Sequence, residues 1–276
     1  MDLLIPTLAE PLPKRQLEKL IADPNYRGEV KLDGERLLVH VDNGNVIPVN
    51  RSGATTTLPS RMIGQAFASL TTGQWAFDGE VVDHQFYIFD MPVAGTAINP
   101  QSPFEDRRAV LEQFMSRWNP GEGINLITSF RDEQDKRDLM ARVLAHGGEG
   151  IMLKDVRAAY IPGKRTDSIR KVKFWASCEV IVTGTGIDGK SNATMAMIDP
   201  DGGTIVDVGT VSTLGKWSTM VNPGDVLEVK YLYSVNPSSP KLYQPNILRI
   251  RHDKKPEECT IDQLKYTNKT VTEIVT

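Results

Sequence analysis

The sequence has few cysteines, no long apolar run and no excess of charge of one sign. Cys178 and Cys259 are its two cysteines and lie far apart in the chain, which supports neither a four-cysteine zinc module nor a disulfide framework. The four histidines show no metal-ligand spacing. No apolar run approaches the ~20 residues needed to cross a bilayer, and the first residues do not resemble a signal peptide. We therefore expect a cytoplasmic protein with no membrane partner.

The charge balance places a condition on any binding of nucleic acid. The chain has 32 basic and 35 acidic residues, a net charge of -3, so such binding would depend on local basic clusters. Each cluster alone is typical of a solvated surface, and we expect only their sum to bind phosphate. The clusters are Lys14-Arg15, Arg107-Arg108, Lys136-Arg137 and Lys164-Arg165.

Two patterns of secondary structure follow each other along the chain. Up to about residue 175, strand-like runs alternate with amphipathic stretches. One predicted helix covers residues 102–118, with Ser102 and Glu105 as a capping box, and a second is ended by Gly147. After Cys178, short Val/Ile/Thr segments alternate with turns. We predict an α+β domain over residues 1–175, a small β-barrel over 176–262, a tail over 263–276 and a hinge near Ala176. The apolar residues of the first helix are Val110, Leu111, Phe114, Met115 and Trp118.

The segment EVKLDGERLLVHV, residues 29–41, groups charges among apolar residues. If residues 29–33 form a strand, its period of two directs Val30 and Leu32 into the core and Glu29, Lys31 and Asp33 to the opposite face. Gly34 then permits a tight turn, and a second strand begins at Arg36. Taken alone, this pattern is equally typical of a solvated strand face with incidental ion pairs.

A reactive lysine would need further cations and a metal nearby, because an ordinary lysine with a pKa of about 10.4 is a poor nucleophile at neutral pH. Lys171 and Lys173 alternate with apolar residues, so a strand would direct both to one cleft, where they would lower the pKa of Lys31 and bind phosphates. Glu80 and Glu149 each adjoin a glycine, where a carboxylate can reach Mg²⁺. Each glutamate alone is typical of a surface charge, but together with the lysines they indicate a site.

These segments occur in an order that resembles the motifs of the covalent nucleotidyltransferases, which comprise DNA ligases, RNA ligases and mRNA capping enzymes. Lys31 matches the lysine that those enzymes nucleotidylate. The resemblance implies an α+β nucleotidyltransferase domain, the ATP-grasp-like adenylation domain of DNA ligases, followed by a small OB-fold β-barrel. Within this superfamily, the sequence most resembles the minimal ATP-dependent DNA ligases of phages and bacteria. The segments are KLDGER (31–36), NRSG (50–53), FDGE (77–80), YIFD (87–90), EGIMLK (149–154), KVK (171–173) and RHDK (251–254).

The resemblance also implies an activity, which is the sealing of nicks in double-stranded DNA by a monomer that uses ATP and Mg²⁺ (or Mn²⁺). Lys31 would attack the α-phosphorus of ATP and retain AMP as a phosphoramidate. AMP would then pass to the 5′-phosphate of the nick, and the adjacent 3′-hydroxyl would displace it. Metal ions and lysines stabilise the phosphoryl charge in such steps.

Residue roles follow from the same resemblance. Asp33, Lys171 and Lys173 would assist Lys31 in catalysis, and Glu80 and Glu149 would bind the metal. Phe89 would stack on adenine, and Glu29 would accept a hydrogen bond from its amino group, which favours ATP over GTP. Arg251 and Lys254 would meet the leaving pyrophosphate. Arg36, Arg51 and Arg165 would contact the nick. The residues expected to bind ATP or AMP are Glu29, Lys31, Arg36, Arg51, Glu80, Phe89, Glu149, Lys171, Lys173, Arg251 and Lys254.

Several alternatives compete with this interpretation. An RNA ligase and a GTP-using capping guanylyltransferase are rivals within the superfamily, and a non-catalytic nucleic-acid-binding module is a third. The segment GTGIDGKS, residues 184–191, also fits the P-loop pattern and leaves a P-loop ATPase as a remote alternative. A P-loop requires a helix that begins at Lys190 and Ser191, but the following NATMAMIDPDGG soon reaches a Pro/Gly turn. A glycine-rich turn of the barrel is the better interpretation.

Overall fold

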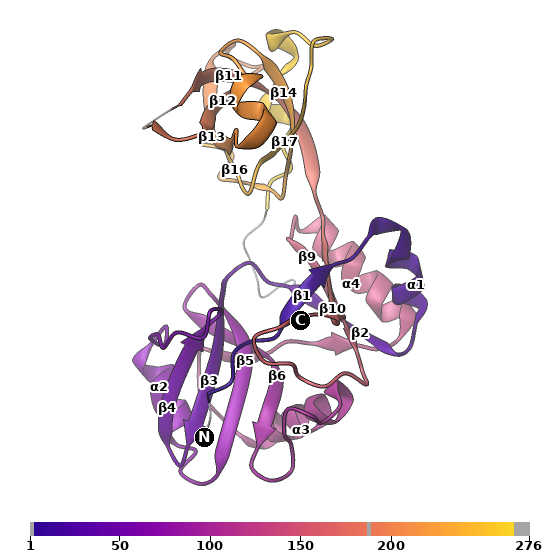
Figure 1. Cartoon of the computed structure of the whole chain (residues 1–276), viewed down its shortest axis with the longest axis vertical. Coiled ribbons are helices and arrows are strands. Elements are labelled where there is room, and N and C mark those ends of the chain that lie inside the picture. Colours follow the sequence, from indigo (N-terminus) through magenta and orange to yellow (C-terminus); the bar gives the residue numbers. More distant parts are fainter. Residues whose placement is uncertain (1–2, 187–188, 268–276) are drawn as a thin grey trace. The chain divides into compact units, whose positions relative to one another are not determined.

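The computed structural model describes residues 3–186 and 189–267, and these form two compact units (Figure 1). The first unit holds residues up to Val143 together with Gly150–Val172. The second holds Leu144–Glu149 and the described residues from Lys173 to Thr267. Among the described residues, no helix is both long and apolar enough to cross a membrane.

In the described part of the chain, two five-stranded sheets and four α-helices build the first unit. One sheet has the order β1-β10-β9-β2-β8, with bounds Leu8–Pro11, Arg165–Lys173, Gly150–Asp155, Tyr26–Lys31 and Ser129–Phe130. The other has the order β4-β3-β5-β6-β7, with bounds Asn45–Asn50, Glu35–Asp42, Gln74–Val82, Gln85–Ala94 and Ile124–Leu126. The helices are α1 (Leu17–Ala22), α2 (Arg61–Ala68), α3 (Phe104–Arg117) and α4 (Glu133–Ala145).

The core of the first unit lies between the second sheet and helices α2 and α3. Leu37, Val39 and Val41 of β3 are buried in it, as the alternation of residues 36–41 predicts. The predicted apolar face of α3 packs on the same core. Gly34 precedes β3, and a Cβ atom at this position would lie 2.1 Å from the carbonyl oxygen of Val81. The close approach of two backbones therefore requires glycine here.

The start of α3 differs from the prediction. The helix begins at Phe104 after the N-cap residue Pro103, which has no side-chain cap. The hydroxyl of Ser102 instead accepts a hydrogen bond from the backbone N–H of Asn99 at 3.2 Å. Glu105 forms an ion pair with Arg27 at 2.8 Å. The prediction of a capping box was therefore wrong, because Glu105 forms an ion pair with Arg27 of β2 instead of capping the helix.

Three of the eight cations in the predicted basic clusters do not lie on the surface. Arg107, Arg108 and Lys136 are 2%, 1% and 0% exposed. Arg107 pairs with Asp90, and the ammonium of Lys136 donates to two backbone carbonyl oxygens. These three cations bind protein groups and do not belong to the exposed basic surface, so the summed phosphate binding that we predict would fall to the remaining members of the clusters. Lys14-Arg15 and Lys164-Arg165 are exposed.

An antiparallel sheet forms most of the second unit. Its order is β13-β12-β11-β14-β17, with bounds Ile205–Ser212, Asn192–Ile198, Ala176–Thr185, Val226–Tyr231 and Asn246–Ile250. A two-stranded ladder joins β15 (Ser234–Val235) to β16 (Lys241–Leu242). Cys178 and Cys259 are both buried and form no disulfide. Of the predicted tail, Leu264 is buried in this unit, while residues 268–276 lie outside the described part of the chain.

The segment with the P-loop pattern joins two antiparallel strands. β11 ends at Thr185 and β12 begins at Asn192, directly after Lys190 and Ser191. A strand therefore follows the Lys-Ser pair, whereas a P-loop requires a helix there. Ile187 and Asp188 of this segment lie outside the described residues. The P-loop alternative is thereby excluded.

Candidate active site

A pocket in the first unit collects side chains from both of its sheets. Seven of the residues predicted for the site line it: Glu29, Lys31, Arg36, Arg51, Glu80, Phe89 and Lys171. The segments that contribute them are far apart in sequence, and strand pairing joins them. The fold therefore brings into one cavity a lysine, further cations, carboxylates and an aromatic ring.

The pairing of β2 with β9 explains why these side chains share a face. In this antiparallel ladder Lys31 lies opposite Gly150, Glu29 opposite Met152, and Arg27 opposite Lys154. Alternate residues of a strand point the same way, and directly opposite residues share a face. Glu29, Lys31, Met152 and Lys154 accordingly all line the pocket. The glycine opposite Lys31 leaves space beside the lysine.

Lys31 is half-buried at the end of β2, and its Nζ lies 3.3 Å from the carbonyl oxygen of Leu32. Lys171 of β10 lines the same pocket. Asp33 lies in the bend between β2 and β3 and is not among the residues that line the pocket. The strand ends at Lys31, two residues earlier than predicted, so the expected run of three charges on one strand face is limited to Glu29 and Lys31.

Glu29 is 1% exposed, although the strand pattern predicted a charged face away from the core. Its Oε2 lies 2.6 Å from Nζ of Lys154, and its Oε1 lies 3.8 Å from Nη1 of Arg108. Oε1 and Nη1 are both buried without a hydrogen-bond partner. Because buried polar atoms are nearly always hydrogen-bonded, an acceptor left in this state indicates a place for a donor from a ligand.

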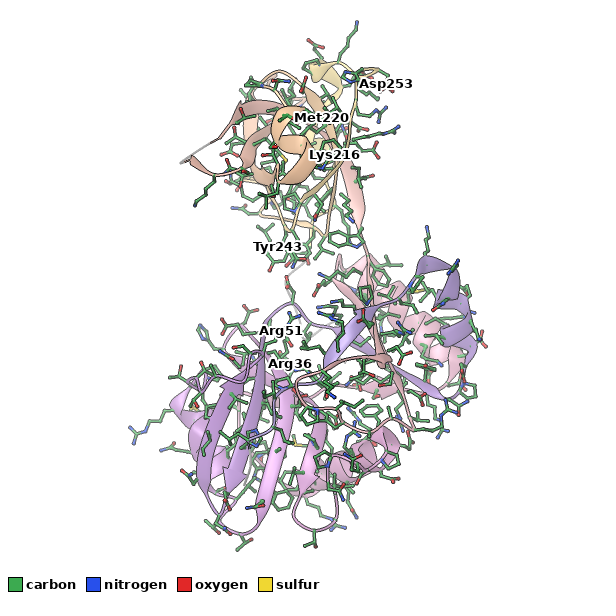
Figure 2. All side chains as sticks on the ribbon, viewed as in Figure 1. Arg36, Arg51, Lys216, Met220, Tyr243 and Asp253 are labelled. Atoms are coloured by element: carbon green, nitrogen blue, oxygen red, sulfur yellow. The ribbon has the colours of Figure 1, made fainter. Side chains whose placement is uncertain are left out.

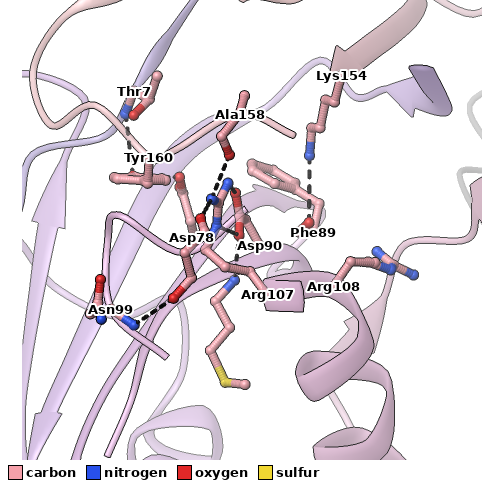
Figure 3. A network of polar contacts seen from close by, with 12 residues as sticks. Thr7, Asp78, Phe89, Asp90, Asn99, Arg107, Arg108, Lys154, Ala158 and Tyr160 are labelled. Carbon is pink, nitrogen blue, oxygen red and sulfur yellow. Dashed lines mark hydrogen bonds and ion pairs between the residues drawn. The ribbon is translucent and has the colours of Figure 1, made fainter. Parts of the chain in front are cut away.

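Arg36 is held in the pocket by a buried carboxylate. Its Nε and Nη2 donate to the two oxygens of Asp78 at 2.7 and 2.8 Å, and the hydroxyl of Tyr160 donates to the same carboxylate at 2.7 Å. The backbone N–H of Thr7 in turn donates to the Tyr160 oxygen (Figure 3). Burial and the charge of Asp78 raise the pKa of Tyr160 well above its ordinary value, so this phenol remains a donor.

Phe89 presents its ring to the pocket beside two cations. The guanidinium carbon of Arg36 and the ammonium of Lys154 each lie 4.4 Å from the ring centroid, within the range of cation–π attraction. The ammonium of Lys154 also donates to the carbonyl oxygen of Phe89 at 3.4 Å (Figure 3). The ring therefore helps to hold both cations in place.

A buried ion pair supports the strand that carries Phe89. Arg107 donates to both oxygens of Asp90 at 2.8 and 2.9 Å, and also to the carbonyl oxygens of Ser102 and Ala158 (Figure 3). Burial alone would raise the pKa of Asp90, but the charge and hydrogen bonds of Arg107 lower it below its ordinary value. This pair links α3, β6 and the segment that leads to Tyr160.

A second groove adjoins the pocket. Arg36, Arg51 and Leu8 line both, and the groove continues past Ser52 and His84. Arg51 directly follows β4 and is exposed. Arg36 lies near the start of β3, beside the end of β4 in the β3–β4 ladder. Figure 2 labels both arginines. Two arginines thus lie where the pocket meets an open groove.

The remaining predicted site residues lie elsewhere. Arg165 begins β10, is exposed and pairs with Glu10 at 3.7 Å. Within the second unit, Glu149 and Lys173 form an ion pair at 2.8 Å, and Arg251 donates to both oxygens of Asp253 at 2.8 Å. Glu179 accepts a further bond from Arg251 at 2.7 Å, and Lys254 pairs with Glu258 at 3.0 Å.

The carboxylates of the pocket suit a metal ion whose other ligands come mainly from a bound molecule and water. Within residues 3–186 and 189–267, no group of three His, Cys, Asp or Glu side chains forms a metal site. In the pocket, Asp78 and Asp90 are bound by arginines, and Glu80 is a further carboxylate of the lining. Mg²⁺ commonly takes one or two protein carboxylates and completes its shell with phosphates and water, so this donor set fits it.

Sequence reasoning missed several residues that the structure brings to the pocket. Asp78 and Lys154 lie inside the FDGE and EGIMLK segments, so their positions were visible but their partners were not. Tyr160 follows β9 in a loop, and no local pattern distinguishes it from an ordinary aromatic residue. Its role depends on contacts with Thr7 and Asp78, which are distant in sequence.

The sequence is similar to those of known DNA ligases. Residues 80–173 match a family model described as the ATP dependent DNA ligase domain. A DNA ligase of Methanothrix thermoacetophila is 27% identical over 306 residues, which cover 88% of this chain and 55% of the relative. The multifunctional non-homologous end joining protein LigD of Mycolicibacterium smegmatis is 26% identical, over 83% of this chain and 36% of the relative. The chain spans about half the length of the first of these relatives and about a third of the second.

Solved structures share the fold. The ligase domain of M. tuberculosis LigD superposes with a TM-score of 0.56 and 24% identity, over 93% of this chain and 98% of that chain. A Lig E DNA ligase, described as binding DNA with a minimal scaffold, gives a TM-score of 0.61 and 20% identity, over 90% of this chain and all of that one. These likenesses confirm the coarser part of the predicted fold, which is a mixture of helices and sheets of the kind found in ligase domains.

Proposed function

This chain belongs to the ATP-dependent DNA ligase family, and on that premise we propose that it joins the 3′-hydroxyl and 5′-phosphate of nicks in double-stranded DNA. The observation that carries the proposal is the position of Lys31 in one pocket with Glu29, Glu80, Phe89 and Lys171. The alternatives of an RNA ligase and a GTP-using capping enzyme gain no specific support from this pocket.

Lys31 forms the covalent intermediate. Its unprotonated Nζ attacks the α-phosphorus of ATP, the bond to the bridging oxygen breaks, and pyrophosphate leaves. AMP remains on Nζ through a phosphorus–nitrogen bond. A 5′-phosphate oxygen of the nick then attacks the same phosphorus and frees the lysine. Finally, the 3′-hydroxyl attacks the 5′-phosphate and releases AMP. Asp33 and Lys171 assist these steps, and cations near the phosphates stabilise the developing charge.

The base is recognised at the buried end of the pocket. Glu29 Oε1 lacks a hydrogen-bond donor and suits the 6-amino group of adenine. Phe89 offers an aromatic surface to the same base. An oxygen at position 6, as in guanine, would bring an acceptor toward this carboxylate. This arrangement supports ATP over GTP.

The nicked DNA is bound at the adjoining groove and beyond. Arg36 and Arg51 lie where the groove meets the pocket, and a guanidinium suits bidentate contact with phosphate. Arg165 and the exposed lysines Lys14 and Lys164 extend the basic surface of the first unit. A single chain, acting as a monomer, carries these groups.

Mg²⁺ or Mn²⁺ would be held by Glu80 together with phosphate oxygens, and when bound it would neutralise phosphoryl charge. We further propose that the second unit is an OB fold. Its five-stranded antiparallel sheet supports this, and Arg251 and Lys254 supply its cations. To meet pyrophosphate, Arg251 would exchange Asp253 for a phosphate. Lys173, paired with Glu149, takes part in phosphate binding.

The proposal is tested by incubating the protein with α-labelled ATP, or α-labelled GTP, and Mg²⁺, and then adding nicked duplex DNA or nicked RNA. We expect label on the protein from ATP, its transfer to the DNA 5′-phosphate, and sealed DNA. Label from GTP alone, or sealing of RNA but not DNA, would assign the chain to a rival class in the superfamily. Absence of any covalent label would defeat the proposal.

A further inference from the structure

The buried lysine Lys154 has no role in the chemistry described above, yet it is one of the most constrained charges in the first unit. It lies on β9 two residues after Met152, lines the pocket and is 5% exposed. Its ammonium lies 2.6 Å from Glu29 Oε2, 3.4 Å from the carbonyl oxygen of Phe89 and 4.4 Å from the ring centroid of Phe89. It thereby joins the two residues proposed to contact the base.

Glu29 has two cationic neighbours and is within hydrogen-bond distance of one of them. Lys154 occupies Oε2, while Arg108 Nη1 lies 3.8 Å from Oε1, too far for a hydrogen bond. Arg108 is itself fixed by Glu112 and by the carbonyl oxygen of Ile127, both at 2.6 Å. The carboxylate is therefore held away from Arg108, and Oε1 keeps its acceptor capacity for a ligand.

We propose that Lys154 determines base specificity, because it holds Glu29 in the one orientation that presents Oε1 to the 6-amino group of adenine. This inference rests on the proposed function. Without the lysine, the carboxylate is free to rotate and pair directly with Arg108, which removes the acceptor from the pocket. Lys154 is thus a positioning residue that acts through Glu29 and touches no reacting atom.

Other charges around the pair are consistent with this role. Arg27 precedes Glu29 on the same strand face, and Asp90 and Arg36 act on Lys154 from β6 and β3. Burial lowers the pKa of Lys154, and the carboxylates of Glu29 and Asp90 oppose that shift. The lysine and the two carboxylates therefore stabilise one another's charges.

The test compares ATP with purine riboside 5′-triphosphate, which has the same ring but lacks the 6-amino group. The measured quantity is the ratio of kcat/KM for labelling of the protein by the two nucleotides. One hydrogen bond to a charged acceptor predicts that the wild-type protein prefers ATP by about 10- to 150-fold. In Lys154→Met we expect this preference to fall to a few-fold, through a higher KM for ATP.

Lys136→Met is the matched control. Lys136 is a buried lysine of the same unit that donates to backbone carbonyl oxygens, including that of Tyr26 on β2, but it does not line the pocket. We expect this variant to lose stability and retain the nucleotide preference. An equal loss of preference in both variants would overturn the inference, because general loosening of the fold would then explain it.

A double-mutant cycle with Glu29→Ala isolates the coupling. Glu29→Ala removes the acceptor, so adding Lys154→Met should change the preference no further. This comparison also remains possible if Lys154→Met alone fails to fold, because the double variant leaves no unpaired charge at the two positions. Additive losses, or an unchanged preference in Lys154→Met, would refute the role of Lys154 while leaving ATP-dependent labelling of the wild-type protein intact. No labelling of the wild-type protein would refute the proposed function itself.

Discussion

Arg36 and Asp78 face each other through two parallel hydrogen bonds, from Nε to Oδ1 at 2.7 Å and from Nη2 to Oδ2 at 2.8 Å. Asp78 is fully buried, whereas the side chain of Arg36 is 20% exposed at the pocket. Burial alone would lower the pKa of Arg36, but the charge and hydrogen bonds of Asp78 raise it. The pair thus fixes a permanent cation, with a defined orientation, where the pocket meets the groove.

Removing this carboxylate should destabilise the fold and weaken the site together. In Asp78→Ala the guanidinium and the Tyr160 hydroxyl lose their shared acceptor, and we expect the free energy of unfolding to fall by about 3–5 kcal/mol. Urea denaturation measures it. Asp201→Ala, at an exposed turn of the second unit, serves as control and should stay within about 0.5 kcal/mol. A similar stability for both variants would mean that the buried pair contributes little.

Tyr160 gives the protein a specific sensitivity to high pH. Its pKa is raised, so above pH ~10 the unfolded chain releases this proton while the folded protein keeps it, and stability falls as pH rises. The contribution reaches about 1.4 kcal/mol per pH unit. Tyr160→Phe should be less stable at neutral pH by about 1.5–3 kcal/mol and should show a shallower decline between pH 10 and 11. If stability declined equally steeply in the wild-type protein and in Tyr160→Phe over this pH range, Tyr160 would not be the group responsible.

Arg107 should behave as a structural residue. Its pair with Asp90 is almost fully buried, so Arg107→Ala leaves an uncompensated carboxylate and should lower the free energy of unfolding by about 3–5 kcal/mol. At a temperature where the variant is folded, the salt dependence of its DNA affinity should equal that of the wild-type protein. A shallower salt dependence would show that Arg107 contacts phosphate after all.

The exposed clusters should give the opposite result. In the triple variant Lys14→Ala, Arg15→Ala and Lys164→Ala, we expect unchanged stability. The plot of log affinity for nicked DNA against log salt concentration should become shallower by about 0.9 for each phosphate contact that is lost. Fluorescence anisotropy with a labelled nicked duplex measures this slope. An unchanged slope would remove these residues from the DNA surface.

How much could be read from the sequence depended on the range of the interactions. The alternation around Leu37 and the helical spacing around Phe114 predicted core faces correctly, because such patterns reflect local geometry. The burial of Arg107 and Lys136 could not be predicted, because it depends on Asp90 and on distant backbone carbonyl groups. Charge in the sequence does not distinguish an exposed pair from a buried one.

The candidate site shows the same difference between features that local patterns predict and features that depend on contacts between distant residues. The segments around Lys31, Glu80 and Phe89 were recognisable, and the structure places these residues in one pocket. The bonds from Lys154 to Glu29 and from Tyr160 to Asp78 join residues more than 80 positions apart, so only the fold reveals them. The orientation of Glu29 was the least accessible feature, since a period of two predicts a face but not the partners found there.

The central claim, that Lys31 carries the nucleotide, is tested most directly by peptide mapping. After incubation with ATP and Mg²⁺, mass spectrometry of the digested protein should locate AMP on the side chain of Lys31. Lys31→Ala should carry no AMP, and Lys190→Ala, which changes the lysine of the excluded P-loop pattern, should be adenylated as fully as the wild-type protein. AMP on another residue, or undiminished adenylation of Lys31→Ala, would contradict the account.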